Sequence, residues 1–273
     1  MEDKWLIGLD IDGTLVHDDG FLSEAVVKQV QRVRSLGHEV FIATGRAAGN
    51  AYPVIKDLGI DNSHAVCSNG AVTIKVDHSL PIGYEPHSVK TFDPSEVLQQ
   101  LIDFLPDAHF AVEDVDGSYR FHKPFPAYSL GDRNFETPLE ELLHHPVSRV
   151  VVLSPQHDVA QFMQLMESIG LHSVSYAIGY TAWLDIAPKG IDKGHGLELL
   201  RNHYGLGKKV LVIGDGRNDI EMFHWAKSHG GYAFAMGQAP DEVKLAATAV
   251  TAAVSEDGVA QVLASLEGLE FLS

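Results

Sequence analysis

Two aspartates near the N-terminus are the residues whose type and spacing most clearly suggest chemistry. Asp10 and Asp12 follow the apolar run Trp5-Leu6-Ile7-Gly8-Leu9, and Gly13-Thr14-Leu15 comes directly after them. Because side chains alternate between the two faces of a strand, both carboxylates start out on the same side. The glycine and threonine that follow would end the strand and let backbone amides approach a ligand. Two acids placed together repel each other and lose hydration, so a divalent cation is their natural partner.

Three further segments carry polar residues where a predicted strand ends or a predicted helix begins. Thr44-Gly45-Arg46 and Asp215-Gly216-Arg217-Asn218-Asp219 each follow an apolar run, and Lys193 opens a helical pattern. In an open α/β sheet, ligands bind beyond the carboxyl ends of the strands, near the point where the strand order reverses. The sequence therefore predicts that these side chains gather at one edge of a sheet.

The elements that must position these residues predict an α/β protein with two domains. The chain of 273 residues is long for one compact domain and suits two. Apolar runs and helical periodicity alternate at both ends of the chain, which indicates βαβ units and a parallel sheet. We expect strands at 4–10, 38–43, 64–67, 208–213 and 231–235, and helices at 22–36, 48–58, 193–204, 217–227, 240–247 and about 257–267.

In the middle of the chain the predicted helices and strands no longer alternate regularly, and their order indicates an inserted α+β domain. Asp93-Pro94-Ser95-Glu96 has the form of a capping box, with proline at the first helical position, so it should start a helix. We expect strands at 108–113, 118–122, 148–153, 172–177 and 181–186, and helices at 137–144 and 157–169. The predicted core is thus residues 1–82 and 188–273, and the predicted insert is 83–187.

Composition narrows the classes of function. The formal net charge of −17 argues against a nucleic acid partner, whose phosphates require Lys and Arg. The chain lacks a long uninterrupted apolar stretch, which argues against a membrane span. The single cysteine, Cys67, excludes an internal disulfide, and the absence of a secretory signal pattern makes the cytoplasm the expected location. The 15 histidines are scattered, and we expect most of them at the surface. The oligomeric state cannot be predicted.

In their order along the chain, the four polar segments resemble the four motifs of the haloacid dehalogenase (HAD) superfamily. These motifs are Asp-x-Asp-Gly-Thr, Thr-Gly-Arg, a lone Lys and Gly-Asp-x-x-Asn-Asp, and the match spans residues 6–219. Ser68-Asn69-Gly70-Ala71 and Ala235-Met236-Gly237-Gln238-Ala239 further resemble the Cof-like branch, subfamily IIB. The resemblance implies a Rossmann-like parallel sheet core with an inserted α+β cap domain of type C2B. Lys189 competes with Lys193 for the third motif, and Lys193 is preferred because it opens the helix.

The resemblance also implies roles for individual residues in phosphoryl transfer. Asp10 would be the nucleophile that forms an aspartyl-phosphate, and Asp12 the general acid and base. Mg²⁺ would be held by Asp10, the backbone carbonyl of Asp12 and Asp215. Asp219 would either lie next to these ligands or bind the ion directly. The remaining residues implied to bind phosphate or substrate are Thr44, Gly45, Arg46, Lys193, Asn218 and Asn69. Arg46 could instead pair with a carboxylate, and Asn69 could be present only because its turn needs left-handed backbone.

These assignments favour a Mg²⁺-dependent phosphatase of small phosphorylated metabolites, with sugar phosphates as the family expectation. A carbon–halogen hydrolase is disfavoured because Asp12 and Asp215 are both present. A phosphohexomutase of the phosphomannomutase type and a non-catalytic phosphometabolite sensor remain as alternatives. In the family the cap contacts the leaving group, so the insert should determine specificity. The candidates in the insert are His122, Lys123, Arg149, Tyr180, Trp183 and Asp185.

Overall fold

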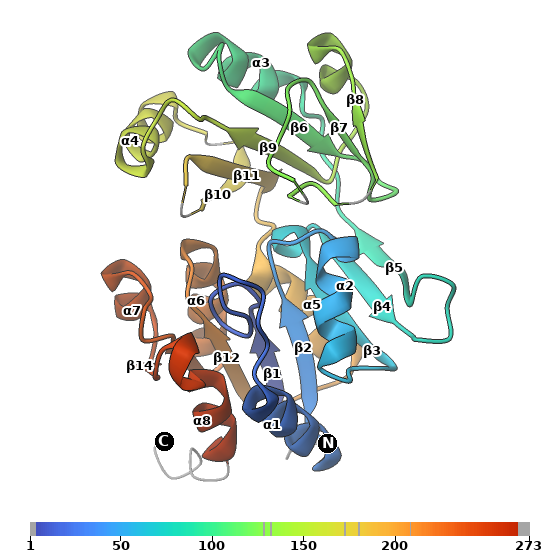
Figure 1. Cartoon of the computed structure of the whole chain (residues 1–273), viewed down its shortest axis with the longest axis vertical. Helices are drawn as coiled ribbons and strands as arrows, with labels where there is room; N and C mark the ends of the chain where they lie inside the picture. The colour runs from blue at the N-terminus through green and yellow to red at the C-terminus, as the bar shows by residue number, and fades with distance from the viewer. Residues whose placement is uncertain are drawn as a thin grey trace.

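The computed structural model describes residues 4–127, 129–131, 133–171, 173–179, 181–207 and 209–266, which form two stacked domains (Figure 1). The larger, lower domain contains an eight-stranded sheet. In spatial order its strands are β14 (Ala249–Val250), β13 (Tyr232–Ala235), β12 (Val210–Gly214), β1 (Leu6–Leu9), β2 (Glu39–Ala43), β3 (Ser63–Cys67), β4 (Val72–Val76) and β5 (Tyr84–Val89). From β14 to β3 the pairs are parallel, whereas β4 and β5 are antiparallel additions at one edge.

Helices cover both faces of this sheet because side chains of its strands are apolar on both faces. Ile7 and Ile42 lie in the core on one face, and Leu6 and Phe41 lie in the core on the other. The helices on the first face are α1 (Glu24–Ser35), α2 (Ala48–Asp57) and α8 (Gly258–Ala264). Those on the second face are α5 (Lys193–His203), α6 (Ile220–Ser228) and α7 (Asp241–Ala246). Short 3₁₀ turns lie at η1 (Ser68–Gly70), η3 (Arg217–Asp219) and η4 (Val254–Glu256).

The strand order reverses at β1. From β1 the chain proceeds to β2 and β3 on one side, and it returns to β12, β13 and β14 on the other. The carboxyl ends of β1 and β12 are therefore the switch point at which α/β sheets bind ligands. Asp10 follows β1 and Asp215 follows β12, so these two residues lie at the switch point.

The smaller domain is built on a six-stranded sheet. In spatial order its strands are β10 (Val174–Ile178), β11 (Trp183–Pro188), β9 (Arg149–Leu153), β6 (His109–Glu113), β7 (Tyr119–Phe121) and β8 (Asn134–Glu136). One face packs against α3 (Ser95–Phe104), α4 (Val159–Ile169) and the turn η2 (Leu139–Leu143) through a core that contains Phe110, Val150 and Val152. Because successive side chains of a strand point to opposite faces, Ala111, Val151 and Tyr119 lie on the other face of the sheet. There they pack with Ala47 of the larger domain.

Four strands of the described chain, β4, β5, β8 and β14, differ from the sequence-based expectation. The predicted insert of 83–187 includes β5, but β5 pairs with β4 in the larger sheet. Neither β4 nor β5 was expected. The reason is local, since β5 is a largely exposed edge strand that contains Pro86 and lacks an apolar run. We propose that the domain boundary lies between Val89 and Ser95. The short strands β8 and β14 were also not predicted.

Several boundaries shift for identifiable reasons. Helix α3 begins at Ser95, and Asp93 accepts the Ser95 amide at 2.9 Å, so the expected capping box with Glu96 is replaced by a tighter turn. The expected helix at 137–144 is the 3₁₀ turn η2. Residues 172, 208 and 267, which begin or end predicted elements, lie outside the described residues. Within the described ranges no helix has the length and apolar character needed to cross a bilayer.

Candidate active site

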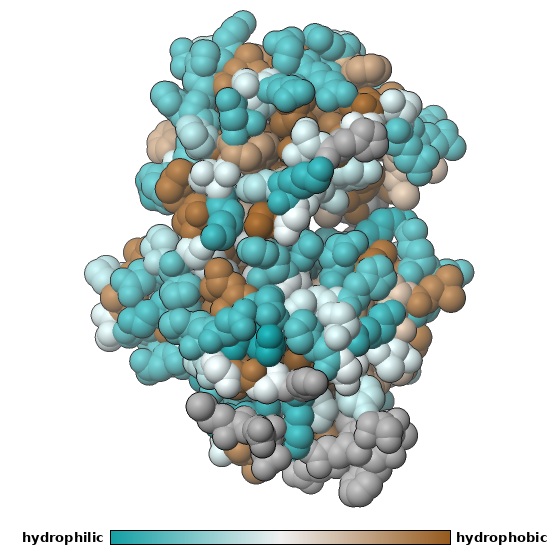
Figure 2. Space-filling model, turned by 180° about the vertical axis from the view of Figure 1, so that it is seen from behind, coloured by the Kyte–Doolittle hydropathy of each residue, from teal (hydrophilic) through white to brown (hydrophobic). Residues whose placement is uncertain are grey.

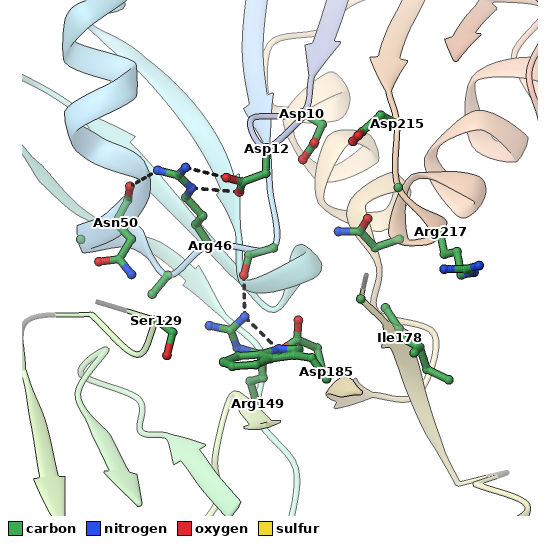
Figure 3. A pocket seen from close by; sticks show the side chains of 18 of the residues that line it. Asp10, Asp12, Arg46, Asn50, Ser129, Arg149, Ile178, Asp185, Asp215 and Arg217 are labelled. Carbon is green, nitrogen blue, oxygen red and sulfur yellow. Dashed lines mark hydrogen bonds and ion pairs between the residues drawn. The ribbon is translucent and has the colours of Figure 1, made fainter. Parts of the chain in front are cut away.

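Three carboxylates meet where β1 and β12 end. The two strands are parallel neighbours, with Leu9 opposite Ile213, so the residues that follow them emerge side by side. Oxygen atoms of Asp10, Asp215 and Asp219 all lie within 4.8 Å of one another, and all three residues are buried. Figure 3 shows Asp10 and Asp215 at the same edge of the core, facing the cavity between the domains.

A buried lysine joins two of these carboxylates. Lys193 is fully buried, and its Nζ donates to Oδ1 of Asp10 and to Oδ1 of Asp219, each at 2.7 Å. The other oxygen of Asp219 accepts the amides of Asp215 and Gly216 at 2.9 Å. The oxygens of Asp219 accept hydrogen bonds of 2.7 to 2.9 Å, whereas those of Asp215 accept longer ones, from Thr14 at 3.5 Å and Gln238 at 3.3 Å, so Asp10 and Asp215 are the better donors to a cation.

The charges of the site are unbalanced without a further cation. Burial raises the pKa of the Asp10 carboxyl well above its usual range, and neighbouring carboxylates raise it further while Lys193 opposes the shift. Burial alone would lower the pKa of Lys193, but the charges of Asp10 and Asp219 outweigh it and raise that pKa. One ammonium group thus faces three acids. Carboxylate oxygens are the ligands that hard divalent cations prefer, so this donor set fits such an ion.

Gly13 lets the two strand ends approach each other. Its φ is +72°, a left-handed conformation, and a Cβ placed there would lie 2.0 Å from Oδ2 of Asp215. The side chain of Gln238 donates to the carbonyl of Gly13 and to Oδ2 of Asp215. The sequence drew attention to the segment around Gln238 but gave this residue no role, because its partners are distant in the chain.

Asp12 lies apart from the buried cluster and is held by Arg46. The side chain of Asp12 is 60% exposed and accepts Nε and Nη2 of Arg46 at 2.9 and 2.6 Å. Arg46 also donates to the carbonyl of Asn50 at 3.2 Å, and both contacts are drawn in Figure 3. The structure thus shows Arg46 paired with a carboxylate, which was one of the two alternatives for this residue, and Arg46 lines the cavity as well.

The remaining core residues of the predicted site occupy the loops that follow β2, β3 and β12. Thr44 is fully buried after β2, and its Oγ1 accepts the amide of Arg46 at 3.1 Å. Gly45 and Asn218 line the cavity. Asn69 has φ of +50°, as the turn prediction required, and its side chain lines a smaller adjoining cavity of about 450 Å³.

The main cavity lies between the two domains and has a volume of about 620 Å³. Of the residues predicted to face it from the insert, Arg149, Trp183 and Asp185 do so. His122 and Lys123 are not among the described residues that line either cavity, since they hydrogen-bond to backbone of the insert. Tyr180 lies outside the described residues. Seen from behind, most of the surface is hydrophilic, and hydrophobic residues are visible in the upper domain and where the domains meet (Figure 2).

Arg149 has partners that the sequence did not reveal. It is buried on β9 rather than placed in a loop, and it pairs with Glu113 at 3.2 Å and Asp185 at 3.3 Å. It also donates to the hydroxyl of Tyr119 and to the carbonyl of Gly45. Burial alone would lower the pKa of Arg149, but Tyr119, Asp185 and Glu113 together outweigh that effect and raise it. Glu113 at the end of an apolar strand was the available signal.

The fold and the site define a class, and comparison with known proteins identifies it. The family model of haloacid dehalogenase-like hydrolases matches residues 7–263, so the chain belongs to that family. The resemblance stated from the motifs is confirmed, as is the expectation of a sheet core with an inserted cap.

The individual proteins to which the chain is similar share a minority of its residues. The chain is 28% identical to 5-amino-6-(5-phospho-D-ribitylamino)uracil phosphatase YitU of Bacillus subtilis over 96% of this chain and 98% of that protein. It is similar in structure to the HAD subclass IIB sugar phosphatase BT4131, with a TM-score of 0.79, 23% identity and coverage of 97% and 99%. SMU.1108c of Streptococcus mutans UA159 also has a TM-score of 0.79, at 19% identity and coverage of 96% and 98%. The family match and the similarity to the curated phosphatase YitU confirm the predicted enzyme class, a HAD-type phosphatase, and the two solved structures confirm the fold.

Proposed function

We propose that this protein is a Mg²⁺-dependent phosphatase that hydrolyses small phosphorylated metabolites through an aspartyl-phosphate on Asp10. The observation that carries the proposal is the buried cluster of Asp10, Asp215 and Asp219 around Lys193, at the floor of an interdomain cavity. A phosphate monoester needs a nucleophile in line, counter-charge for the transferring group and a proton for the leaving oxygen.

Each requirement has a candidate in the structure. Oδ2 of Asp10 attacks phosphorus, since Oδ1 accepts from Lys193. Asp12 protonates the leaving oxygen and then takes a proton from the water that hydrolyses the acyl phosphate, so the carboxylate of Asp10 is regenerated. Asp10, Asp215 and the backbone carbonyl of Asp12 would hold Mg²⁺, which would neutralise charge on the phosphoryl oxygens.

Donors from the core would bind the phosphoryl oxygens. Lys193 provides a fixed positive charge beside Asp10, and Gly45 and Asn218 line the main cavity. We assign Thr44 to the same group of donors. The cavity of about 620 Å³ is much larger than a phosphate, which supports a substrate with a sizeable leaving group. We further propose a cytoplasmic location, because the substrates would be intracellular metabolites.

The test is release of inorganic phosphate across a panel of phosphorylated metabolites, with Mg²⁺ and with EDTA. The panel should contain hexose phosphates and a phosphorylated ribitylamino-heterocycle, because the relatives are named for such substrates. Asp10→Asn should abolish turnover, and Asp114→Asn, a change of the same kind in an Arg-bound carboxylate on the insert, should not. Full activity with EDTA would refute the metal dependence. Isomerisation of a hexose 1-phosphate faster than phosphate release would favour the mutase instead.

A further inference from the structure

The side chain of Asn69 connects the two domains beside the cavity. Its Nδ2 donates to Oδ2 of Asp185 at 3.2 Å, and its Oδ1 accepts Nδ2 of Asn218 at 3.0 Å. Asp185 belongs to β11 of the insert, whereas Asn69 and Asn218 belong to two separate loops of the core. A chain of hydrogen bonds thus runs from the insert to Asn218, which lines the main cavity next to Asp215 and Gly216.

The backbone of Asn69 is fixed on several sides. Its amide donates to the carbonyl of Thr44 at 3.1 Å, which ties the loop to the strand end after β2. The next residue, Gly70, has φ of +96°, and a Cβ there would lie 2.0 Å from the carbonyl oxygen of Asp192. The loop is therefore pressed against the start of α5. Because the backbone is held, neighbouring residues can change only the orientation of the side-chain amide of Asn69.

The two asparagine amides also pack against Gly45. A Cβ on Gly45 would lie 3.2 and 3.3 Å from the amide atoms of Asn69 and 3.4 Å from Nδ2 of Asn218. The carbonyl of Gly45 accepts from Arg149, which comes from the insert. The insert therefore contacts the proposed phosphoryl-binding loop at the Gly45 carbonyl and, through Asp185, at the asparagine pair.

Asp185 determines which way the amides point. A carboxylate can only accept, so Asn69 must present its NH₂ group to Asp185 and its oxygen to Asn218. The second oxygen of Asp185 accepts Nη1 of Arg149 at 3.3 Å and Nε1 of Trp183 at 3.2 Å. Both oxygens are thus occupied by protein donors. This arrangement suits a residue that orients its neighbours better than one that binds a leaving group.

We infer that Asp185 is a positioning residue: acting through Asn69, it orients Asn218 towards the transferring phosphoryl group. The phosphoryl site of the core is then complete only when the insert is seated on it. This inference rests on the proposed phosphatase function and adds to it. It predicts that loss of the Asp185 carboxylate slows phosphoryl transfer even from a substrate too small to touch the insert.

The test compares Asp185→Asn with wild type on acetyl phosphate and on the best sugar phosphate of the panel. The new amide would have to place its NH₂ group either against Arg149 and Trp183 or against Asn69, and those partners are themselves donors. We expect kcat to fall by the same factor on both substrates, about 10- to 100-fold. Asp185→Glu keeps a carboxylate and should recover part of the rate. Asp114→Asn should match wild type.

A double-mutant cycle tests the path through Asn69. If Asp185 acts through it, the variant that combines Asp185→Asn with Asn69→Ala should be no slower than the slower single variant. Assays are run well below each variant's thermal midpoint, so that loss of folded protein cannot produce the effect. A defect confined to the sugar phosphate would overturn the inference, as would multiplicative single effects. If wild type cleaves neither substrate, the proposed function itself has failed.

Discussion

Lys193 donates a 2.7 Å hydrogen bond to Asp10, and the exposed fractions of the two side chains are 0% and 6%. The same ammonium group binds Asp219 at the same distance. A lysine buried in this way is kept charged by its two acids, and it offsets the repulsion between them. Lys193 therefore contributes both to the stability of the core and to the charge beside the proposed nucleophile Asp10. A change of Lys193 should affect both unfolding and catalysis.

Replacing Lys193 with methionine should damage both activity and stability. We expect kcat to fall at least about 100-fold, because a fixed positive charge beside the phosphoryl group is lost. We also expect the free energy of unfolding to fall by about 3 kcal/mol, because buried carboxylates lose their counter-charge. Steady-state kinetics and urea denaturation measure the two effects. Lys189→Met is the matched control, since Lys189 is exposed, and a loss of activity there instead would reassign the third motif.

Gly13→Ala should remove metal binding, because the added methyl group would overlap the Asp215 carboxylate. In wild type we expect saturating Mg²⁺ to raise the thermal midpoint by about 5 °C. The variant should show a much smaller rise in differential scanning fluorimetry. Gly117→Ala is the control, because Gly117 has a similar φ of +77° but an added Cβ would meet nothing within 4 Å. Equal Mg²⁺ responses in the two variants would contradict Asp215 as a ligand.

Arg46→Met should slow reactions with poor leaving groups most. Arg46 holds Asp12 by two hydrogen bonds, and Asp12 is proposed to protonate the leaving oxygen. A good leaving group needs little protonation, so 4-nitrophenyl phosphate should lose less activity than an alkyl phosphate, for which we expect a loss of about 100-fold. Arg133→Met, on an exposed pair with Asp116, should leave both rates unchanged. A uniform loss on both substrates would instead indicate that Arg46 binds the phosphoryl group.

A histidine cluster away from the active site should make stability fall in mild acid. The rings of His64, His87 and His203 lie 4.5 to 5.0 Å apart, and Nδ1 of His64 lies 2.7 Å from the Tyr204 hydroxyl. Burial, the two other histidines and Lys75 lower the pKa of His64 from 6.5 to about 4. The native state thus keeps His64 neutral, while the unfolded chain takes up a proton below about pH 6.5.

The stabilisation from neutral His64 is therefore complete above about pH 6.5 and is lost as the pH falls towards 4. Allowing for solvent screening of the outer two rings, we expect this group to account for about 1 kcal/mol between pH 7.5 and 5. Urea denaturation at the two pH values measures it. His64→Gln should reduce the pH dependence, whereas His144→Gln, an exposed position, should not. An unchanged pH dependence in His64→Gln would show that other groups cause it.

Much of the core and its site could be predicted because the signals are local. An apolar run that ends in Asp10, Thr44 or Asp215 predicts both a buried strand and the polar residue at its end. Parallel sheets bring such ends to one edge, so the meeting of Asp10 and Asp215 followed from element order alone. Strand β5 was missed because an exposed antiparallel edge strand depends on its neighbours more than on its own pattern.

The sequence by itself determined the class of chemistry, because four short motifs carry the required side chains at strand and helix ends. Only the tertiary structure decided which residues of the insert reach the cavity and which partners hold them there. Arg149 and Asp185 lie far along the chain from Gly45 and Asn69, and a contact between distant segments leaves no mark in the local pattern of either. Packing of the two domains against each other brings these groups into hydrogen-bonding distance.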